Sequence, residues 1–557
     1  MCPAASLPPP SKLFWPGWLA LVALVVLVVL VGSVFWPVLN FDFVRWDDDI
    51  NITQNSLLTE PWSRSLAGQF FEGDQALRFK PLHWLCFRLL HAAFGFNPAG
   101  WHAFNLGLHT MATVLFYVVL RQLFRRFMPA TGNIPVEWGA WLGAALWALH
   151  PLRAEAVAWV TASPYPLTAV CLLASFACYL KALDEPSPSR RWLGLAWVFA
   201  VAGYGSYPVG VTYGLWLLVV DRWLPPAGPV NDEPGKSGWN WAWLAKHAWF
   251  LAPAALAVGI TLWSRFMAPG IFTATPTVQS VGVLSRLTMA LASLTDLVRC
   301  LFWPVDLTPN MPPLVAVSGN VPLQVMALLA LLGLALVWRG RQQHPVRALV
   351  WLGFVALALP CLGWTERPTW PVDRYSYIVH LVLIGGLTGW MICWVGDIRS
   401  RRVAVSAGAV ALLLISAWTT RAQIMIWRDS PALFTHMERH PHFADNPRQQ
   451  GHVYVLWARY EAAVARPTVA AMLFNRAQQV YLAAIRAAVA QQDYPEALAL
   501  STHLEHHFTL TPVMRRERGA WLLRLGRRPE ALTELQLARA ALPDDARVKL
   551  LLEEAQR

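Results

Sequence analysis

The chain has 557 residues, of which 56% are hydrophobic and only 14% are charged. A soluble globular protein carries about 25% charged residues, so the composition argues against a soluble enzyme. The formal net charge of +12 would favour a nucleic-acid partner in a soluble chain, but here we assign it to Lys and Arg retained in cytoplasmic loops and to a basic tail. We therefore expect a multi-pass membrane protein embedded in a lipid bilayer, with no nucleic-acid partner.

Eleven apolar runs are expected to cross the membrane as helices. The first, residues 17–40, carries no charged residue and is long enough to cross roughly 30 Å of hydrocarbon. A further run, about 284–303, contains Arg286, Asp296 and Arg299, and we expect it to lie on the membrane surface. The eleven runs are centred near residues 28, 111, 148, 173, 198, 215, 253, 330, 355, 386 and 411.

Lys and Arg gather in alternate connecting loops, for example at Arg121, Arg125 and Arg126, whereas the turns near 161–164 and 204–208 have none. This positive-inside pattern predicts a cytoplasmic N-terminus. The 38–100 loop, the 265–321 loop and the C-terminal region then face the other side. That side is the periplasm if the membrane is a bacterial inner membrane, or the lumen of the endoplasmic reticulum if the host is a eukaryote.

From about residue 421 the composition changes to Arg, Ala, Leu, Glu and His with helical periodicity. Two stretches lie 34 residues apart: residues 493–497 (Asp-Tyr-Pro-Glu-Ala) and 527–531 (Arg-Arg-Pro-Glu-Ala). This period predicts tetratricopeptide-like (TPR-like) repeats, whose concave surface usually holds a protein or peptide segment. A short helical tail that caps the membrane domain is the alternative. We thus expect an all-α fold, with a membrane domain at 1–420 and a helical-repeat domain at 421–557.

Three adjacent carboxylates, Asp47, Asp48 and Asp49, stand at the start of the first external loop. Because like charges repel, we expect at least one raised pKa unless a cation compensates. Such a group suits a general base or a ligand of a divalent metal ion. A solvated acidic turn is the alternative, since Asp favours turns and helix caps.

Several polar residues occur at membrane depth. His102, Asn105 and His109 are spaced by three and four residues, so they share one face of the second span. His150 and Glu155 stand at the outer end of the third span. Such groups are costly in hydrocarbon and normally face a cavity or each other, with hydrogen bonds between helices as the alternative.

Arg374 stands at the outer mouth of the tenth span, where its guanidinium is suited to a lipid phosphate. A snorkelling arginine is the alternative. Lys80 is a second candidate for a phosphate. The predicted topology places both on the side of the acidic loop. There a carboxylate base would deprotonate an acceptor hydroxyl, while a cation would stabilise the leaving phosphate of a lipid-linked sugar.

Several short motifs occur in a fixed order along nearly the whole chain. They are residues 43–49 (Phe-Val-Arg-Trp-Asp-Asp-Asp) with Asn55, 80–82 (Lys-Pro-Leu), 102–109, 150–159, 221–223 (Asp-Arg-Trp), 373–377 (Asp-Arg-Tyr-Ser-Tyr) and 427–430 (Trp-Arg-Asp-Ser). In these motifs the chain resembles the GT-C membrane glycosyltransferases, specifically the bacterial branch of the transmembrane and tetratricopeptide-repeat O-mannosyltransferases. The resemblance implies an eleven-span fold, a polyprenyl- or dolichyl-phosphate sugar donor, and transfer to a protein hydroxyl.

These observations predict a glycosyltransferase that acts by a single inverting displacement. Asp47 is the expected general base and Asp48 orients it or the acceptor, while Arg374 and Lys80 bind the donor phosphate. The residues expected to line the sugar and acceptor cavity are Asp49, His102, Asn105, His109, His150, Glu155 and Tyr375. A metal ion, if one binds, would use Asp47, Asp48 and Asp49.

Three positions depart from the pattern of this family. Residues 163–165 read Ser-Pro-Tyr where the family tends to show Arg-Lys-Asp, Tyr207 stands where it shows Lys, and Lys80 stands where it shows Arg. Two other functions stay open: a non-catalytic membrane scaffold that binds partners through its repeats, and a lipid-linked polysaccharide ligase or polymerase.

Overall fold

The structure, a computed structural model, describes residues 17–63, 79–128, 131–185, 189–224, 241–267, 282–309, 320–363, 371–396, 398–443 and 446–557. Across these residues every regular element is a helix and none is a strand, which confirms the predicted all-α fold. The chain divides into two compact units, Met1–Asp429 and Ser430–Arg557.

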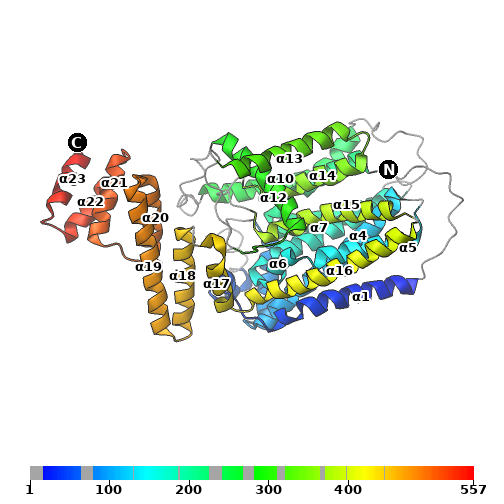
Figure 1. Cartoon of the computed structure of the whole chain (residues 1–557), viewed down its shortest axis with the longest axis horizontal. Coiled ribbons are helices and arrows are strands. Elements are labelled where there is room, and N and C mark those ends of the chain that lie inside the picture. Colours follow the sequence, from blue (N-terminus) through cyan, green and yellow to red (C-terminus); the bar gives the residue numbers. More distant parts are fainter. Residues whose placement is uncertain are drawn as a thin grey trace. The chain divides into compact units, whose positions relative to one another are not determined.

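Each predicted apolar run contains or adjoins a helix of the first unit (Figure 1). Seven described helices are long and apolar enough to cross a membrane, so the chain is a multi-pass membrane protein. Four others, α5, α8, α9 and α14, have only 16, 17, 11 and 14 residues, and the count of eleven spans stays a prediction. The eleven helices are α1 (Gly17–Phe35), α4 (Pro98–Phe127), α5 (Asn133–Ala148), α7 (Pro164–Asp184), α8 (Arg190–Ser206), α9 (Tyr213–Trp223), α10 (Trp241–Met267), α13 (Val321–Gly340), α14 (Pro345–Ala358), α15 (Ser376–Val395) and α16 (Arg399–Ile424).

The outer faces of these helices are apolar. On α13, for example, Leu328, Leu332 and Leu336 are all more than half exposed. A continuous apolar surface of this kind is unstable in water and is matched by lipid tails.

The run at 284–303 forms α12 (Val283–Phe302), which packs against α13 and buries Asp296 beside Arg299, with Nε and Oδ1 2.7 Å apart. Its placement on the membrane surface stays a prediction. Much of the predicted 265–321 loop (268–281 and 310–319) and residues 64–78 of the 38–100 loop lie outside the described residues.

The connection between α5 and α7 is a buried series of short turns. It consists of η5 (Pro151–Arg153), α6 (Ala154–Ala158) and η6 (Val160–Ala162). Proline lacks a backbone N–H and clashes with the preceding turn, so Pro151 and Pro164 limit continuous helix at each end of the series. Interrupted helices leave backbone carbonyls without helical partners, and buried carbonyls need hydrogen-bond donors from elsewhere.

The second unit contains only helices in its described part. They are α17 (Ser430–Arg439), η11 (Pro441–Phe443), α18 (Pro447–Ala463), α19 (Pro467–Ala490), α20 (Tyr494–His507), α21 (Pro512–Arg524), α22 (Arg528–Ala541) and α23 (Ala546–Gln556). Helices from α18 onward pack against their neighbours in chain order (Figure 1).

Glycines allow the helix pairs of this unit to approach closely. A Cβ atom on Gly519 would lie 2.5 Å from Cγ of Leu535, and one on Gly451 would lie 2.3 Å from the ring of Tyr481. The two stretches 34 residues apart begin α20 and α22, each of 14 residues. The specific TPR-like assignment stays a prediction.

Candidate active site

Hydrogen bonds of Asp48 link the acidic loop, which contains residues 47–49, to the turn before α7. Its carboxylate is only 1% exposed. Its Oδ1 accepts hydrogen bonds from the backbone N (3.0 Å) and Oγ1 (2.6 Å) of Thr161 in η6, and its Oδ2 accepts one from the backbone N of Val44 (3.0 Å). Asp48 is therefore a positioning residue that joins two segments 113 positions apart.

Asp47 differs from its neighbour in both exposure and backbone. It is exposed, and its φ of 72° lies in the left-handed region. Asp visits this region more readily than most residues because its short polar side chain bonds locally. The backbone oxygen of Asp47 accepts bonds from N (2.8 Å) and Nδ2 (3.0 Å) of Asn51, so the turn that presents Asp47 is held at both ends.

Burial raises the pKa of Asp48 to about 7, although the hydrogen bonds from Thr161 and Val44 act in the opposite direction. Burial also raises the pKa of Asp49, against the attraction of Arg45. The expected raised pKa is confirmed, but its main cause is loss of water. Repulsion from Asp47 contributes less than burial to both shifts.

Glu155 and Arg374 form an ion pair between α6 and η9 (Asp373–Tyr375). Oε2 of Glu155 accepts a bond from the backbone N of Arg374 (2.8 Å), and Oε1 accepts one from Nη1 (2.5 Å). The guanidinium lies 5.1 Å from the ring centroid of Trp159. The two hydrogen bonds to Glu155 fix Arg374 in place. Its side chain remains 18% exposed, so the guanidinium is still accessible to an anion.

One short segment, residues 155–161, thus brings the acidic loop and Arg374 together. Thr161 holds Asp48 and Glu155 holds Arg374. The first and last spans meet the same region: the backbone N of Asp42 donates to the carbonyl of Arg428 at 3.0 Å, and the ring of Trp427 stacks on Trp159 with centroids 5.5 Å apart.

Arg153 supports this arrangement from behind and was missed by sequence reasoning. Its guanidinium is completely buried and donates to the carbonyl oxygen (3.1 Å) and Oγ (2.7 Å) of Ser376 and to Nδ1 of His380 (3.3 Å). It therefore fixes the start of α15, directly after Arg374. A charged residue in the apolar 150–159 run was the available signal.

The polar face of α4 supplies donors to the broken backbone. Nδ2 of Asn105 donates to the carbonyl of Trp159 at 3.0 Å. His109 bonds through Nδ1 to the hydroxyl of Tyr377 (2.7 Å) and through Nε2 to the carbonyl of Ala148 (3.2 Å). Both side chains are buried. The structure places Asn105 and His109 in packing between helices, the alternative weighed above.

His150 and His102 are also buried. Nε2 of His150 lies 3.0 Å from the carbonyl oxygen of Leu301, and Nδ1 accepts a bond from N of Leu152. Neither ring nitrogen of His102 has a hydrogen-bond partner among the described residues. Oδ1 of Asn105, on the same face of α4, also lacks a hydrogen-bond partner there.

Lys80 and Tyr375 stand nearer to the exposed part of the site. Lys80 caps the start of α3 (Pro81–Phe94), with Nζ 4.1 Å from the ring centroid of Trp84. Tyr375 is partly exposed, and its ring centroid lies 5.6 Å from the Arg374 guanidinium.

The three adjacent aspartates fit a metal ion poorly. Both oxygens of Asp48 already accept hydrogen bonds, and Asp47 and Asp49 differ from it in exposure. No group of three His, Cys, Asp or Glu side chains within the described ranges is arranged to hold a metal ion.

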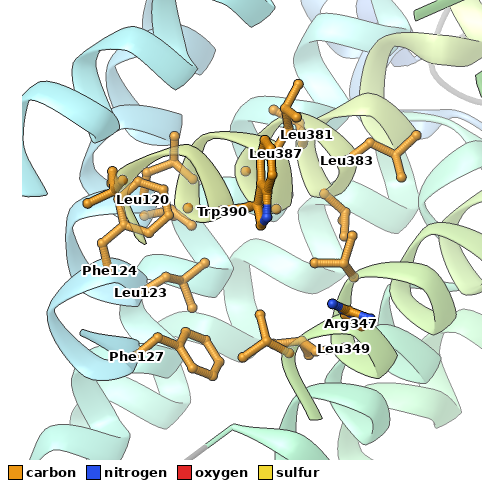
Figure 2. Close-up of a pocket in the computed structure, with 18 of the residues that line it drawn as sticks. Leu120, Leu123, Phe124, Phe127, Arg347, Leu349, Leu381, Leu383, Leu387 and Trp390 are labelled. Atoms are coloured by element: carbon orange, nitrogen blue, oxygen red, sulfur yellow. The ribbon is translucent and has the colours of Figure 1, made fainter. Parts of the chain in front are cut away.

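An apolar cavity of about 1190 Å³ lies among the helices, mainly α4, α7, α14 and α15 (Figure 2). Arg347, in the first turn of α14, is among the residues that line the cavity. The wall also includes Leu301, whose carbonyl bonds His150, and Ile378, which follows Tyr377. The residues labelled in Figure 2 are Leu120, Leu123, Phe124, Phe127, Arg347, Leu349, Leu381, Leu383, Leu387 and Trp390. Its chemistry suits a hydrocarbon chain.

The chain is similar to several proteins named as protein O-mannosyl-transferases. The chain is 31% identical over 183 residues to Protein O-mannosyl-transferase Tmtc2 of Drosophila melanogaster, which is 31% of this chain and 18% of that protein. It is 32% identical over 181 residues to Drosophila Protein O-mannosyl-transferase Tmtc1, covering 32% of this chain and 19% of the relative. It is 29% identical over 203 residues to human Protein O-mannosyl-transferase TMTC4, covering 34% of this chain and 26% of the relative.

The predicted resemblance to this family is confirmed by these matches. The matched segments span only 18–26% of the length of these three relatives. No family model matches the chain. No solved structure matches it.

Proposed function

We propose that this chain is a GT-C-type membrane glycosyltransferase. It transfers a sugar, mannose in the first instance, from a polyprenyl- or dolichyl-phosphate donor to a hydroxyl of a protein. The similarity to relatives named as protein O-mannosyl-transferases supports this class of reaction. The observation that carries the proposal is the convergence of the acidic loop and Arg374 on residues 155–161.

In the proposed reaction, Asp47 takes the proton of the acceptor hydroxyl as its oxygen attacks the anomeric carbon. The bond from that carbon to the phosphate oxygen breaks, and the lipid phosphate leaves with the electron pair. Arg374 stabilises the phosphate, and Lys80 is the second candidate cation. A single displacement inverts the anomeric centre. Asp48 fixes the loop through Thr161, so the exposed carboxylate next to it keeps its position.

The apolar cavity is the proposed place for the prenyl chain of the donor, because its wall reaches Leu301 and Ile378 near the polar residues. We further propose that the repeats of the second unit bind the protein acceptor. The N-terminus would lie in the cytoplasm and the site on the opposite side of a bacterial inner membrane, as the charge pattern predicts.

The test is transfer of labelled sugar by the purified full chain from polyprenyl-phosphate mannose to a protein acceptor. We expect Asp47→Asn to lose about 100-fold or more of the rate, because a general base contributes about 10²–10⁴-fold. Its thermal unfolding should match the wild type, since Asp47 is exposed. Asp48→Asn should lose both rate and stability.

Asp42→Asn is the matched control, because this carboxylate is exposed in the same loop. It should retain the wild-type rate. Equal rates in the wild type and Asp47→Asn would overturn the mechanism. If the chain is a non-catalytic scaffold, the wild type and Asp47→Asn also behave alike, because neither transfers sugar. Inversion is tested separately by the anomeric configuration of the product.

A further inference from the structure

Three tyrosines from three separate elements meet beside Arg374. Tyr165 is in the first turn of α7, Tyr207 lies between α8 and η7 (Pro208–Gly210), and Tyr375 is in η9. The ring centroid of Tyr165 is 5.0 Å from that of Tyr207 and 6.2 Å from that of Tyr375. We refer to these three residues as the tyrosine cluster.

The tyrosine cluster reaches Arg374 through Tyr375. The guanidinium of Arg374 lies 5.6 Å from the ring centroid of Tyr375, and the ring of Tyr165 connects Tyr375 to Tyr207. Tyr165 is only 3% exposed, whereas Tyr207 and Tyr375 are partly exposed. Tyr165 therefore supports the other two rings, which form the accessible wall.

The charges around this wall are already largely balanced. Glu155 binds Arg374 through two hydrogen bonds, and only part of the guanidinium remains open. The contacts that the tyrosine cluster adds to a ligand held by Arg374 come from neutral groups. The cluster offers aromatic faces and phenol hydroxyls, each of which donates and accepts hydrogen bonds.

A sugar matches this combination of groups. Its ring presents faces of C–H bonds that pack on aromatic rings, and its edge carries hydroxyls that exchange hydrogen bonds with phenols. A prenyl chain has no polar edge to use these hydroxyls. A phosphate alone has no apolar face for the rings.

We propose that the tyrosine cluster is the subsite for the sugar of the donor, with Tyr207 and Tyr375 in contact and Tyr165 behind them. This inference rests on the proposed function, because it takes the sugar to be attached to the phosphate at Arg374. The start of α3 adjoins the same place: a Cβ atom on Gly205 would lie 3.5 Å from Cγ of Pro81, next to Lys80.

The test measures how much the sugar adds to lipid binding. Dissociation constants of the purified full chain are measured for polyprenyl phosphate, and for the same lipid carrying mannose, glucose or galactose. The quantity of interest is the ratio of the constant for the bare lipid to that for the best sugar-bearing lipid. We expect Tyr207→Phe and Tyr375→Phe each to reduce this ratio by about 3- to 10-fold, equivalent to one hydrogen bond.

Tyr207→Ala removes the ring as well and should bring the ratio close to one. The bare lipid should bind all these variants as it binds the wild type. Tyr204→Phe is the matched control, because its hydroxyl donates to the carbonyl of Phe250 (3.0 Å) in the packing of α8 on α10. It should leave the ratio unchanged.

The outcomes separate this inference from the proposed function. If the wild type prefers a sugar-bearing lipid and every tyrosine variant keeps that preference, the subsite is overturned while the proposed function stands. If the wild type binds bare and sugar-bearing lipids equally, the subsite is overturned. If it also transfers no sugar, the proposed function fails with it.

Discussion

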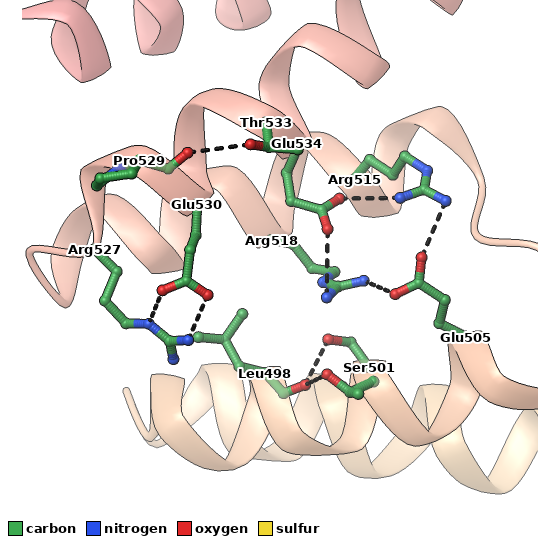
Figure 3. A network of polar contacts seen from close by, with 11 residues as sticks. Leu498, Ser501, Glu505, Arg515, Arg518, Arg527, Pro529, Glu530, Thr533 and Glu534 are labelled. Atoms are coloured by element: carbon green, nitrogen blue, oxygen red, sulfur yellow. Dashed lines mark hydrogen bonds and ion pairs between the residues drawn. The ribbon is translucent and has the colours of Figure 1, made fainter. Parts of the chain in front are cut away.

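The two units of this protein differ in how their charged side chains are paired and exposed. The first unit, Met1–Asp429, is called the membrane unit below. In the membrane unit, Glu155 is buried and binds the side chain and the backbone of Arg374. In the second unit, Arg515 and Arg518 each pair with both Glu505 and Glu534, which gives a ring of four alternating charges (Figure 3). All four of these side chains are partly exposed.

The two sets of ion pairs differ in the number of partners that each charge has and in their exposure to water. Removing one arginine from the ring leaves each glutamate with the other arginine and with water. Removing Glu155 leaves Arg374, whose side chain is only 18% exposed, without the carboxylate that pairs with it. A buried charge that loses its partner costs about 3–5 kcal/mol, whereas an exposed pair contributes about 0–1 kcal/mol.

The largest effect is expected for Glu155→Gln, which keeps the shape of the side chain and removes its charge. We expect the free energy of unfolding to fall by about 3 kcal/mol and sugar transfer to be lost, because Arg374 is no longer fixed. Thermal unfolding in detergent and the transfer assay measure the two effects. The double variant Glu155→Gln/Arg374→Gln should recover part of the stability without activity. If Glu155→Gln unfolds with the same free energy as the wild type, the buried pair is no more sensitive to loss of a partner than the exposed ring of the second unit.

A smaller loss is expected for Asn105→Leu, which removes the donor to the carbonyl of Trp159. An unsatisfied buried carbonyl costs about 1–3 kcal/mol, and the same measurement should detect a change in this range. Gln122→Leu, on the same helix, serves as comparison because its bond to the carbonyl of Ala177 is long, at 3.4 Å, and only part-buried. Equal losses in both variants would mean that the helix breaks do not depend on Asn105.

We expect the buried carboxylate of Asp48 and the exposed carboxylate of Glu530 to change the stability in opposite directions as the pH rises. Asp48 holds its proton up to about pH 7 in the fold and releases it near 3.8 when unfolded, so the stability it contributes falls as pH rises through 7. The Arg527 hydrogen bond lowers the pKa of Glu530, so the stability from Glu530 is present above its unfolded pKa and is lost as pH falls through its lower folded pKa.

Thermal unfolding of the wild type, Asp48→Asn and Glu530→Gln between pH 3 and 8 tests this contrast. The difference between the wild type and Asp48→Asn should change by about 1 kcal/mol per pH unit between pH 5 and 7. The difference for Glu530→Gln should be smaller, since this pair is exposed, and should change only at acidic pH. Parallel curves for both variants would refute the assignment of Asp48 as a buried proton-binding group.

The smallest effect is expected for Arg518→Gln in the ring of the second unit. Because Arg515 still pairs with both glutamates, we expect a loss of less than about 1 kcal/mol. The double variant Arg515→Gln/Arg518→Gln should lose more than the sum of the two single losses. Additive losses would show that the ring has no redundancy.

Sequence patterns predicted the helices of this protein better than its contacts. Apolar runs marked most helices of the membrane unit, although not α3, and the spacing of His102, Asn105 and His109 correctly placed them on one buried face. The hydrogen-bond partner of Asp48 could not be predicted, because Thr161 is 113 residues away and carries no local signal. Arg153 was missed for the same reason: its partner Ser376 comes from another span. The stacking partner of Trp427 could not be predicted either, because Trp159 is far from it in the sequence.

The hydrogen bond from Asp42 to Arg428 has a consequence for how the protein is made. The acidic loop follows the first span, yet its final position depends on a carbonyl 386 residues later in the chain. At a synthesis rate of about 5–20 residues per second, the ribosome needs about 20–80 s to cover that distance. During this interval the acidic loop has been synthesised, but the later segments that complete the site have not. The proposed activity therefore begins only once the last span has entered the membrane.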